Sequence, residues 1–89
     1  MSMDDQYREM QRFRDSLISF NDKLQASMRD LEARHDAVSP HWKDNMRRMY
    51  DAHWHPLDKQ MQHYLRREGP TYVNFLKEKL AALGRYLRG

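Results

Sequence analysis

The feature that most constrains this chain is a run of apolar residues that recurs every seven positions through its first 38 residues. The members of this run are Met3, Met10, Leu17, Leu24, Leu31 and Val38. Large apolar side chains three or four positions away, such as Phe13, Phe20 and Met28, widen the run into a stripe. Because residues three, four and seven apart share one face of an α-helix, the pattern predicts one long amphipathic helix whose apolar face meets another helix.

Capping residues and prolines predict where the helices begin and end. Ser2 and Asp5 have the spacing of a capping box, which starts the first helix near residue 3. Ser39 followed by Pro40 is a strong signal for the start of a second helix. The predicted helices span about 3–36, 40–68 and 70–87. Because the first turn is short, the first two helices must run antiparallel.

Two prolines interrupt the apolar stripe of the second half. Pro56 and Pro70 lack an amide hydrogen, so we expect a kink or a break at each, with Gly69–Pro70 the stronger one. Leu65 and Tyr72 are seven residues apart, which predicts that the stripe continues in phase across Pro70. A bent second helix is the favoured interpretation, and a reversal at Pro70 that makes a three-helix bundle is the alternative.

The size of the chain favours association. Its 89 residues predict a single domain, 1–89, and a chain of this size buries only about 60–65% of its unfolded surface. No segment approaches the roughly 18–20 apolar residues that span a bilayer. The segment 1–5 contains two aspartates and no basic residue, whereas a cleavable signal peptide begins with basic residues. We therefore expect no membrane insertion and a cytoplasmic protein, with export without a cleavable signal peptide as the alternative.

No residue cluster predicts catalysis, a metal or a cofactor. The chain has no cysteine, its serines fall in the first helix or in caps, and three glycines cannot build a phosphate-binding loop. None of the five histidines has another histidine three or four positions away. His53 and His55 point about 200° apart on a helix, which argues against a shared ion. We predict a protein that is not an enzyme.

The predicted architecture is therefore all-α, an antiparallel helical hairpin assembled into a dimer or a larger oligomer. Trp42, Tyr50 and Trp54 follow the turn and are expected to anchor the contacts, because large aromatic side chains bury the most area. The predicted interface residues are Met10, Phe13, Leu17, Phe20, Leu24, Met28, Leu31, Trp42, Tyr50, Trp54, Leu57 and Met61.

The charge is uneven along the chain. Residues 1–45 hold nine acids and seven bases, whereas residues 46–89 hold four acids and nine bases. A basic second half allows an alternative function, in which a helical module binds nucleic acid. The candidate residues for this alternative are Arg66, Arg67, Lys77 and Lys79.

The layout resembles the WXG family of small secreted helical hairpins, of the early-secreted-antigen type. Trp42 occupies the position of the family's tryptophan, Tyr50 follows eight residues later, and Leu57 and Tyr64 continue in steps of seven. Asp44 stands where the family has glycine, and the family's tyrosine-to-acid export spacing occurs only at Tyr64 and Glu68, in mid-helix.

The resemblance implies a bacterial protein whose hairpins dimerise into four-helix bundles, and export by an ATPase-driven secretion system. The sequence thus predicts a self-associating, non-enzymatic interaction protein that serves as a scaffold, an adaptor or a secretion-linked factor. A needle-type or filament-type subunit is a further alternative, because such subunits are also small helical hairpins.

Overall fold

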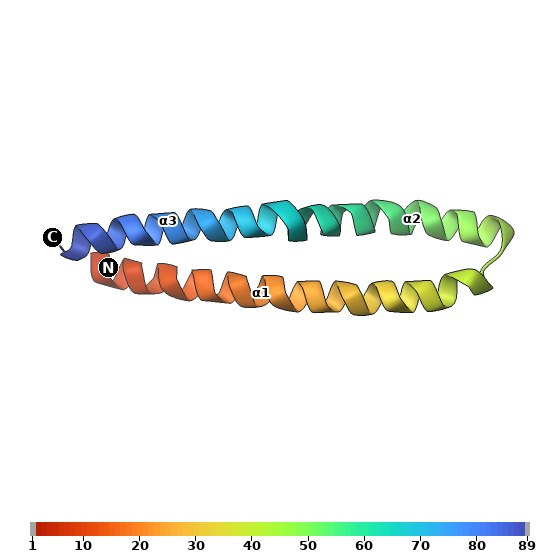
Figure 1. Ribbon diagram of the computed structural model, residues 1–89, viewed down its shortest axis with the longest axis horizontal. Helices are drawn as coiled ribbons and strands as arrows, with labels where there is room; N and C mark the ends of the chain where they lie inside the picture. The colour runs from red at the N-terminus through yellow and green to blue at the C-terminus, as the bar shows by residue number, and fades with distance from the viewer. Residues whose placement is uncertain (1, 89) are drawn as a thin grey trace.

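The computed structural model describes residues 2–88 and is an antiparallel helical hairpin 66 Å long, with lateral dimensions of 19 and 16 Å (Figure 1). Helix α1, Met3–Val38, forms one arm, and helices α2, Asp44–His63, and α3, Gly69–Arg88, form the other arm in line. Both chain ends lie at one end of the hairpin (Figure 1). The predicted all-α hairpin is confirmed, and because α2 and α3 continue in one arm, the chain does not reverse at Pro70 to make a three-helix bundle (Figure 1).

The start of α1 follows the predicted capping. The Ser2 hydroxyl accepts a hydrogen bond of 3.1 Å from the backbone N–H of Asp5. The Arg8 guanidinium donates to the Asp5 carboxylate. The bond from Arg8 and those from Ser2 lower the pKa of Asp5 below its ordinary value of 3.8. The negative charge of Asp5 in the first turn also interacts favourably with the positive end of the helix dipole.

The predicted start of the second helix at residue 40 is wrong. Ser39 has helical backbone angles and its N–H donates to the carbonyl of His35, so it extends α1 instead of capping a new helix. Ser39–His41 forms a short 3-10 turn, and Pro40 takes its second position. Helix α2 begins only at Asp44, whose φ of 61° lies in the left-handed region.

The core between the two arms is thin and consists of a few apolar side chains. The buried apolar residues of the described chain are Met28, Trp54, Val73, Leu76 and Leu80. On α1 the other arm faces a register that includes Tyr7, Asn21, Met28 and His35, at multiples of seven residues. The predicted heptad run from Met3 to Val38 lies beside this register, with both end members exposed.

The two prolines differ in their effect. Helix α2 runs through Pro56 without a break. Before Pro70, residues Tyr64–Glu68 form a π-helical segment, hereafter the π segment, in which the N–H of Gly69 donates to the carbonyl of Tyr64. Because Pro70 lacks an N–H and its ring would meet the carbonyl of Arg66 in an α-helix, the wider π turn accommodates it.

The stripe does not stay in phase across Pro70. Tyr72 is 45% exposed, whereas its neighbour Val73 is 8% exposed. The predicted seven-residue step from Leu65 to Tyr72 is therefore wrong by one residue, because the π segment shifts the phase.

Candidate protein interface

One side of the hairpin carries a strip of exposed apolar side chains along both arms, hereafter the apolar face. It consists of Met3, Phe13, Phe20, Leu31 and Val38 of α1, Met46 and Leu57 of α2, and Tyr72 of α3. Two aromatic contacts join the arms along this side. Phe13 meets Tyr72 edge to face with ring centroids 6.1 Å apart, and Phe20 meets Tyr64 in the same way at 6.5 Å.

The members of the apolar face are open to solvent despite these contacts. Phe20 is 55% exposed and Met46 is 62% exposed. Helical geometry explains this placement, since α1 residues three positions after a seam residue, such as Leu31 after Met28, lie about 60° to one side of it. The exposed members of the heptad run, Met3, Leu31 and Val38, therefore form with Phe13 and Phe20 a second helical stripe, which the other arm of the hairpin does not cover.

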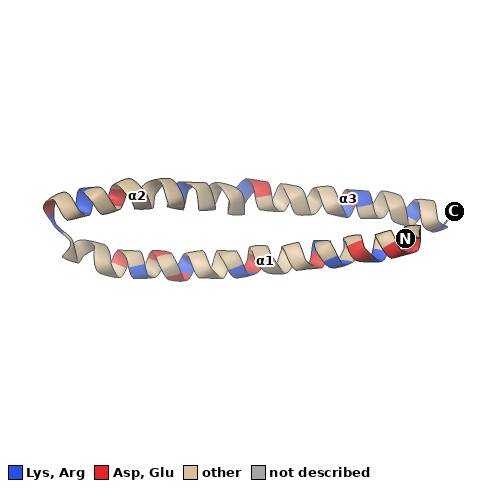
Figure 2. Ribbon diagram, turned by 180° about the vertical axis from the view of Figure 1, so that it is seen from behind, with Lys and Arg blue, Asp and Glu red and all other residues tan. Residues whose placement is uncertain are grey.

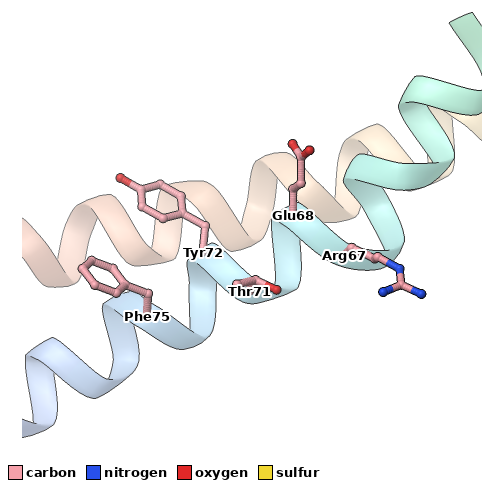
Figure 3. Close-up of a pocket in the computed structure, with 5 residues that line it drawn as sticks. All are labelled: Arg67, Glu68, Thr71, Tyr72 and Phe75. Atoms are coloured by element: carbon pink, nitrogen blue, oxygen red, sulfur yellow. The ribbon is translucent and has the colours of Figure 1, made fainter.

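A hollow lies on the outer side of α3, next to the apolar face. Its volume is about 520 Å³ and it is lined by Arg67, Glu68, Thr71, Tyr72 and Phe75. The Tyr72 and Phe75 rings stack with centroids 6.3 Å apart, and Figure 3 shows them on the same side of α3 while Arg67 points away. The walls offered by these rings are apolar, which suits a hydrophobic side chain.

The aromatic residues near the turn pack within the hairpin. The His35 ring stacks on Trp54 with centroids 4.4 Å apart, and its Nδ1 is hydrogen-bonded to the Tyr50 hydroxyl. Trp42 meets the Tyr50 ring edge to face at 4.1 Å. The predicted anchors Trp42, Tyr50 and Trp54 therefore hold the turn, and His35 is a partner that the sequence interpretation missed.

The predicted interface residues divide into three groups. Met28 and Trp54 are buried between the arms. Half-buried positions at the border of the seam are occupied by Met10, Leu17, Leu24, Trp42, Tyr50 and Met61. The exposed members are Phe13, Phe20, Leu31 and Leu57, and all four belong to the apolar face.

The four basic candidates for nucleic-acid binding do not converge. Arg66 lines a polar hollow with Glu32 and Gln62, and Lys77 lines another with Asp22. Arg67 lies beside the aromatic hollow on α3, and the Lys79 ammonium sits 5.4 Å from the Phe75 ring centroid. Figure 2 shows acidic and basic segments interspersed along both arms. No single basic patch unites these four side chains.

Polar side chains also bridge the arms, and sequence interpretation did not identify them. The Tyr64 hydroxyl donates a hydrogen bond of 2.6 Å to Asn21 Oδ1, and the Gln62 amide donates to Glu32. Asn21 falls on the inner register of α1, and Glu32 lies one helical turn after the register residue Met28. The sequence could have indicated these bridges, because a polar residue close to the seam needs a hydrogen-bond partner on the other arm.

Residues 2–88 contain no group of three His, Asp or Glu side chains placed to hold an ion. No helix in this range is apolar enough over a sufficient length to cross a bilayer. Comparisons of the chain with protein-family models, curated proteins and solved structures find no match.

Proposed function

We propose that the protein is a non-enzymatic interaction module that self-associates by packing the apolar face of one hairpin on that of a second copy. The exposure of Leu31 of the heptad run and of the flanking Phe13 and Phe20 carries this proposal. A heptad repeat stabilises a helix only where its apolar residues fill holes on a facing helix. The hairpin supplies no such helix on this side, whereas a second copy does.

The accessible surface supports an additional partner. The hairpin exposes 7143 Å², whereas a compact monomer of the same mass exposes about 5,600 Å². The difference of about 1,500 Å² exceeds the ~800 Å² that each partner of a standard interface buries. A face that runs the 66 Å length of the hairpin is long enough to provide that area.

A second copy fits this face in length and chemistry. Two-fold dimers are the commonest protein assemblies, and their interfaces bring one surface patch against itself. Two hairpins stacked in this way form a four-helix bundle with Phe20 near its centre. The apolar side chains of α1 and α2 then fill the interior of the bundle, while the Arg, Asp and Glu side chains of α1 stay at its edge.

The turn geometry supports a role related to the WXG-like hairpins. Asp44 takes the place of the family's glycine and has a φ of 61°, which glycine adopts without strain. We infer that the assembled hairpin acts as a scaffold, an adaptor or a secretion-linked factor.

Light scattering behind a sizing column tests the proposal, with the purified protein measured over a hundredfold range of concentration. The expected result is a discrete dimer or larger assembly that survives dilution. A monomeric mass at every concentration would overturn the proposal.

A further inference from the structure

The rotation of α3 about its axis does not follow from an unbroken helix. Tyr72 comes 18 residues after Trp54, which is about five turns of an α-helix. An uninterrupted helix would therefore place Tyr72 directly in line with Trp54, facing α1. In the structure Val73 takes that place and is buried, while Tyr72 is exposed.

The π segment accounts for this shift of one residue. A π turn closes its hydrogen bond over five residues instead of four, as in the bond from Gly69 N–H to the Tyr64 carbonyl. It therefore holds one residue more than the α turn it replaces. Since each residue of an α-helix turns the chain by about 100°, the extra residue rotates all of α3 by that angle.

Helix α3 carries two strips of large side chains that are one residue apart. The inner strip is buried or half-buried against α1 and consists of Val73, Leu76, Leu80 and Leu87. The outer strip consists of the residue before each of these, namely Tyr72, Phe75, Lys79 and Tyr86. Without the π segment, the outer strip would pack against α1 and the inner strip would be exposed.

The inner strip fits the narrow space between the arms. Gly84 lies in the same register, and a Cβ on it would be 3.4 Å from the Tyr7 hydroxyl, so the arms approach closely at this level. The outer strip would bring the Tyr72 and Phe75 rings and the Lys79 ammonium into that space. Burying an unpaired ammonium is unfavourable. The phase shift keeps the aromatic rings and the charge outside.

We infer that the π segment is a one-residue phase insert that turns the outer strip of α3 away from α1 and presents it to the second copy. The identity of this partner rests on the proposed function. Tyr72 belongs to the apolar face, and Phe75 extends it around α3 through the stacked pair of rings. Phe75 is 49% exposed and Tyr86 is 70% exposed, so both have area to bury in an assembly.

The missing donor of Pro70 and two contacts of Asn21 hold the insert in place. Pro70 cannot donate the N–H that an α turn would require at its position. Gly69 allows the close approach of Asn21, whose Nδ2 would lie 3.1 Å from a Cβ at this position. The hydroxyl of Tyr64, the first residue of the π segment, donates to the same Asn21 side chain.

Single-residue deletions test the insert directly. Because Pro70 disfavours an α turn at this point, the deletions are made in a chain that carries Pro70→Ala. Deleting Arg67 there removes the extra residue, so the π segment closes into an α turn and α3 keeps its rotation. We expect the helical circular dichroism and the assembled mass of the Pro70→Ala parent, with a melting temperature within a few degrees of it. Deletion of Glu68 is a second variant with the same expectation. The matched control deletes Lys23 in the same parent, because Lys23 lies near the same level of α1 in a regular helix and has no insert to absorb the loss.

The control should lose most of the cooperative melting transition. Equal damage from the Arg67, Glu68 and Lys23 deletions would overturn the phase insert. Phe75→Ser tests the partner: it should raise at least tenfold the concentration at which the assembly forms, whereas Glu78→Ser on the same helix should leave that concentration unchanged.

If Phe75→Ser assembled at the same concentration as the wild type, the assignment of the outer strip to the interface would be overturned. A monomeric wild type would instead overturn the proposed function. The deletions would still test the insert by circular dichroism in that case, so the two failures are distinguishable.

Discussion

The hydroxyl of Tyr64 donates a hydrogen bond of 2.6 Å to the side-chain carbonyl of Asn21, 43 residues earlier in the chain. This bond joins the two arms at the π segment, near the middle of the hairpin. Gly69 packs against the same Asn21 side chain. One polar residue of α1 therefore contacts both ends of the irregular region in the other arm.

Replacing Tyr64 with Phe removes this hydrogen bond and keeps the ring that contacts Phe20. A part-buried Asn21 carbonyl is left without a partner, so the free energy of unfolding should fall by about 1 kcal/mol. Urea denaturation measures the change. In a variant that already carries Asn21→Leu, the same substitution should cost much less, and an equal cost in both backgrounds would contradict a direct bond.

The substitution Gly69→Ala should destabilise the hairpin although alanine is the better helix former. The new Cβ would lie 3.1 Å from Asn21 Nδ2 and 3.2 Å from the Tyr64 carbonyl oxygen. Such overpacking costs about 1–3 kcal/mol, more than the ~1 kcal/mol that alanine gains in a helix. Gly84→Ala is the control, because its Cβ would meet only the Tyr7 side chain at 3.4 Å or more. Thermal melting should place Gly69→Ala below wild type and Gly84→Ala at or above it.

Serine in place of Phe20 should weaken self-association. Phe20 is 55% exposed in the hairpin, and an aromatic side chain at the centre of an interface commonly contributes 2 kcal/mol or more. We expect at least a tenfold rise in the dissociation constant, measured by sedimentation equilibrium. Ser19→Ala, at the exposed neighbouring position, should leave the constant unchanged. Equal constants for both variants would place the interface elsewhere.

At Asp44 the left-handed backbone should favour glycine over alanine. A φ of 61° costs a residue with a Cβ about 1–2 kcal/mol, and glycine avoids that cost. Asp44→Gly should therefore be more stable than Asp44→Ala by about 1 kcal/mol in urea denaturation. At Asn45, inside α2, the order of glycine and alanine should reverse. The same order at both positions would contradict the left-handed conformation.

The carboxyl of Asp5 should titrate below its ordinary pKa, because hydrogen bonds from Arg8 and Ser2 stabilise its charged form. Because the pKa is lower in the folded state, the charged Asp5 carboxylate stabilises the fold at pH values above 3.8, the ordinary pKa. This contribution is lost as the pH falls through the folded-state pKa. Arg8→Ala should raise the pKa of Asp5 toward 3.8, as followed by NMR titration. Arg12→Ala, which removes the neighbouring pair with Glu9, should leave Asp5 unchanged.

Much of the fold could be predicted from local patterns. The Ser2 cap and the unbroken heptad run define α1, and the short turn determines the antiparallel arms. The prediction that a helix starts at Ser39–Pro40 was wrong because a cap signal does not show whether the preceding helix has ended. The Ser39 N–H still donates to the carbonyl of His35, as it would inside α1. The rotation of α3 was predicted wrongly because a proline indicates an irregular turn without showing how many extra residues that turn contains.

The candidate interface could be predicted only as a mixed set. Apolar spacing of three and four residues identifies both the seam and the face beside it, since the two stripes on α1 lie only about 60° apart. Met28 and Leu31 therefore look alike in sequence, and the position of the second arm separates them. His35 was missed because a histidine does not count as apolar in a sequence pattern, although its ring stacks on the Tyr50 and Trp54 rings as an apolar aromatic ring would.

The beginning of α1 and the end of α3 lie close together at one end of the hairpin (Figure 1). The Trp42 turn lies at the far end of a body 66 Å long. A reporter domain tethered to either terminus would therefore sit at one pole of the rod and leave the opposite pole unobstructed. The hairpin thus separates whatever its ends carry from whatever its tip touches by nearly seven nanometres.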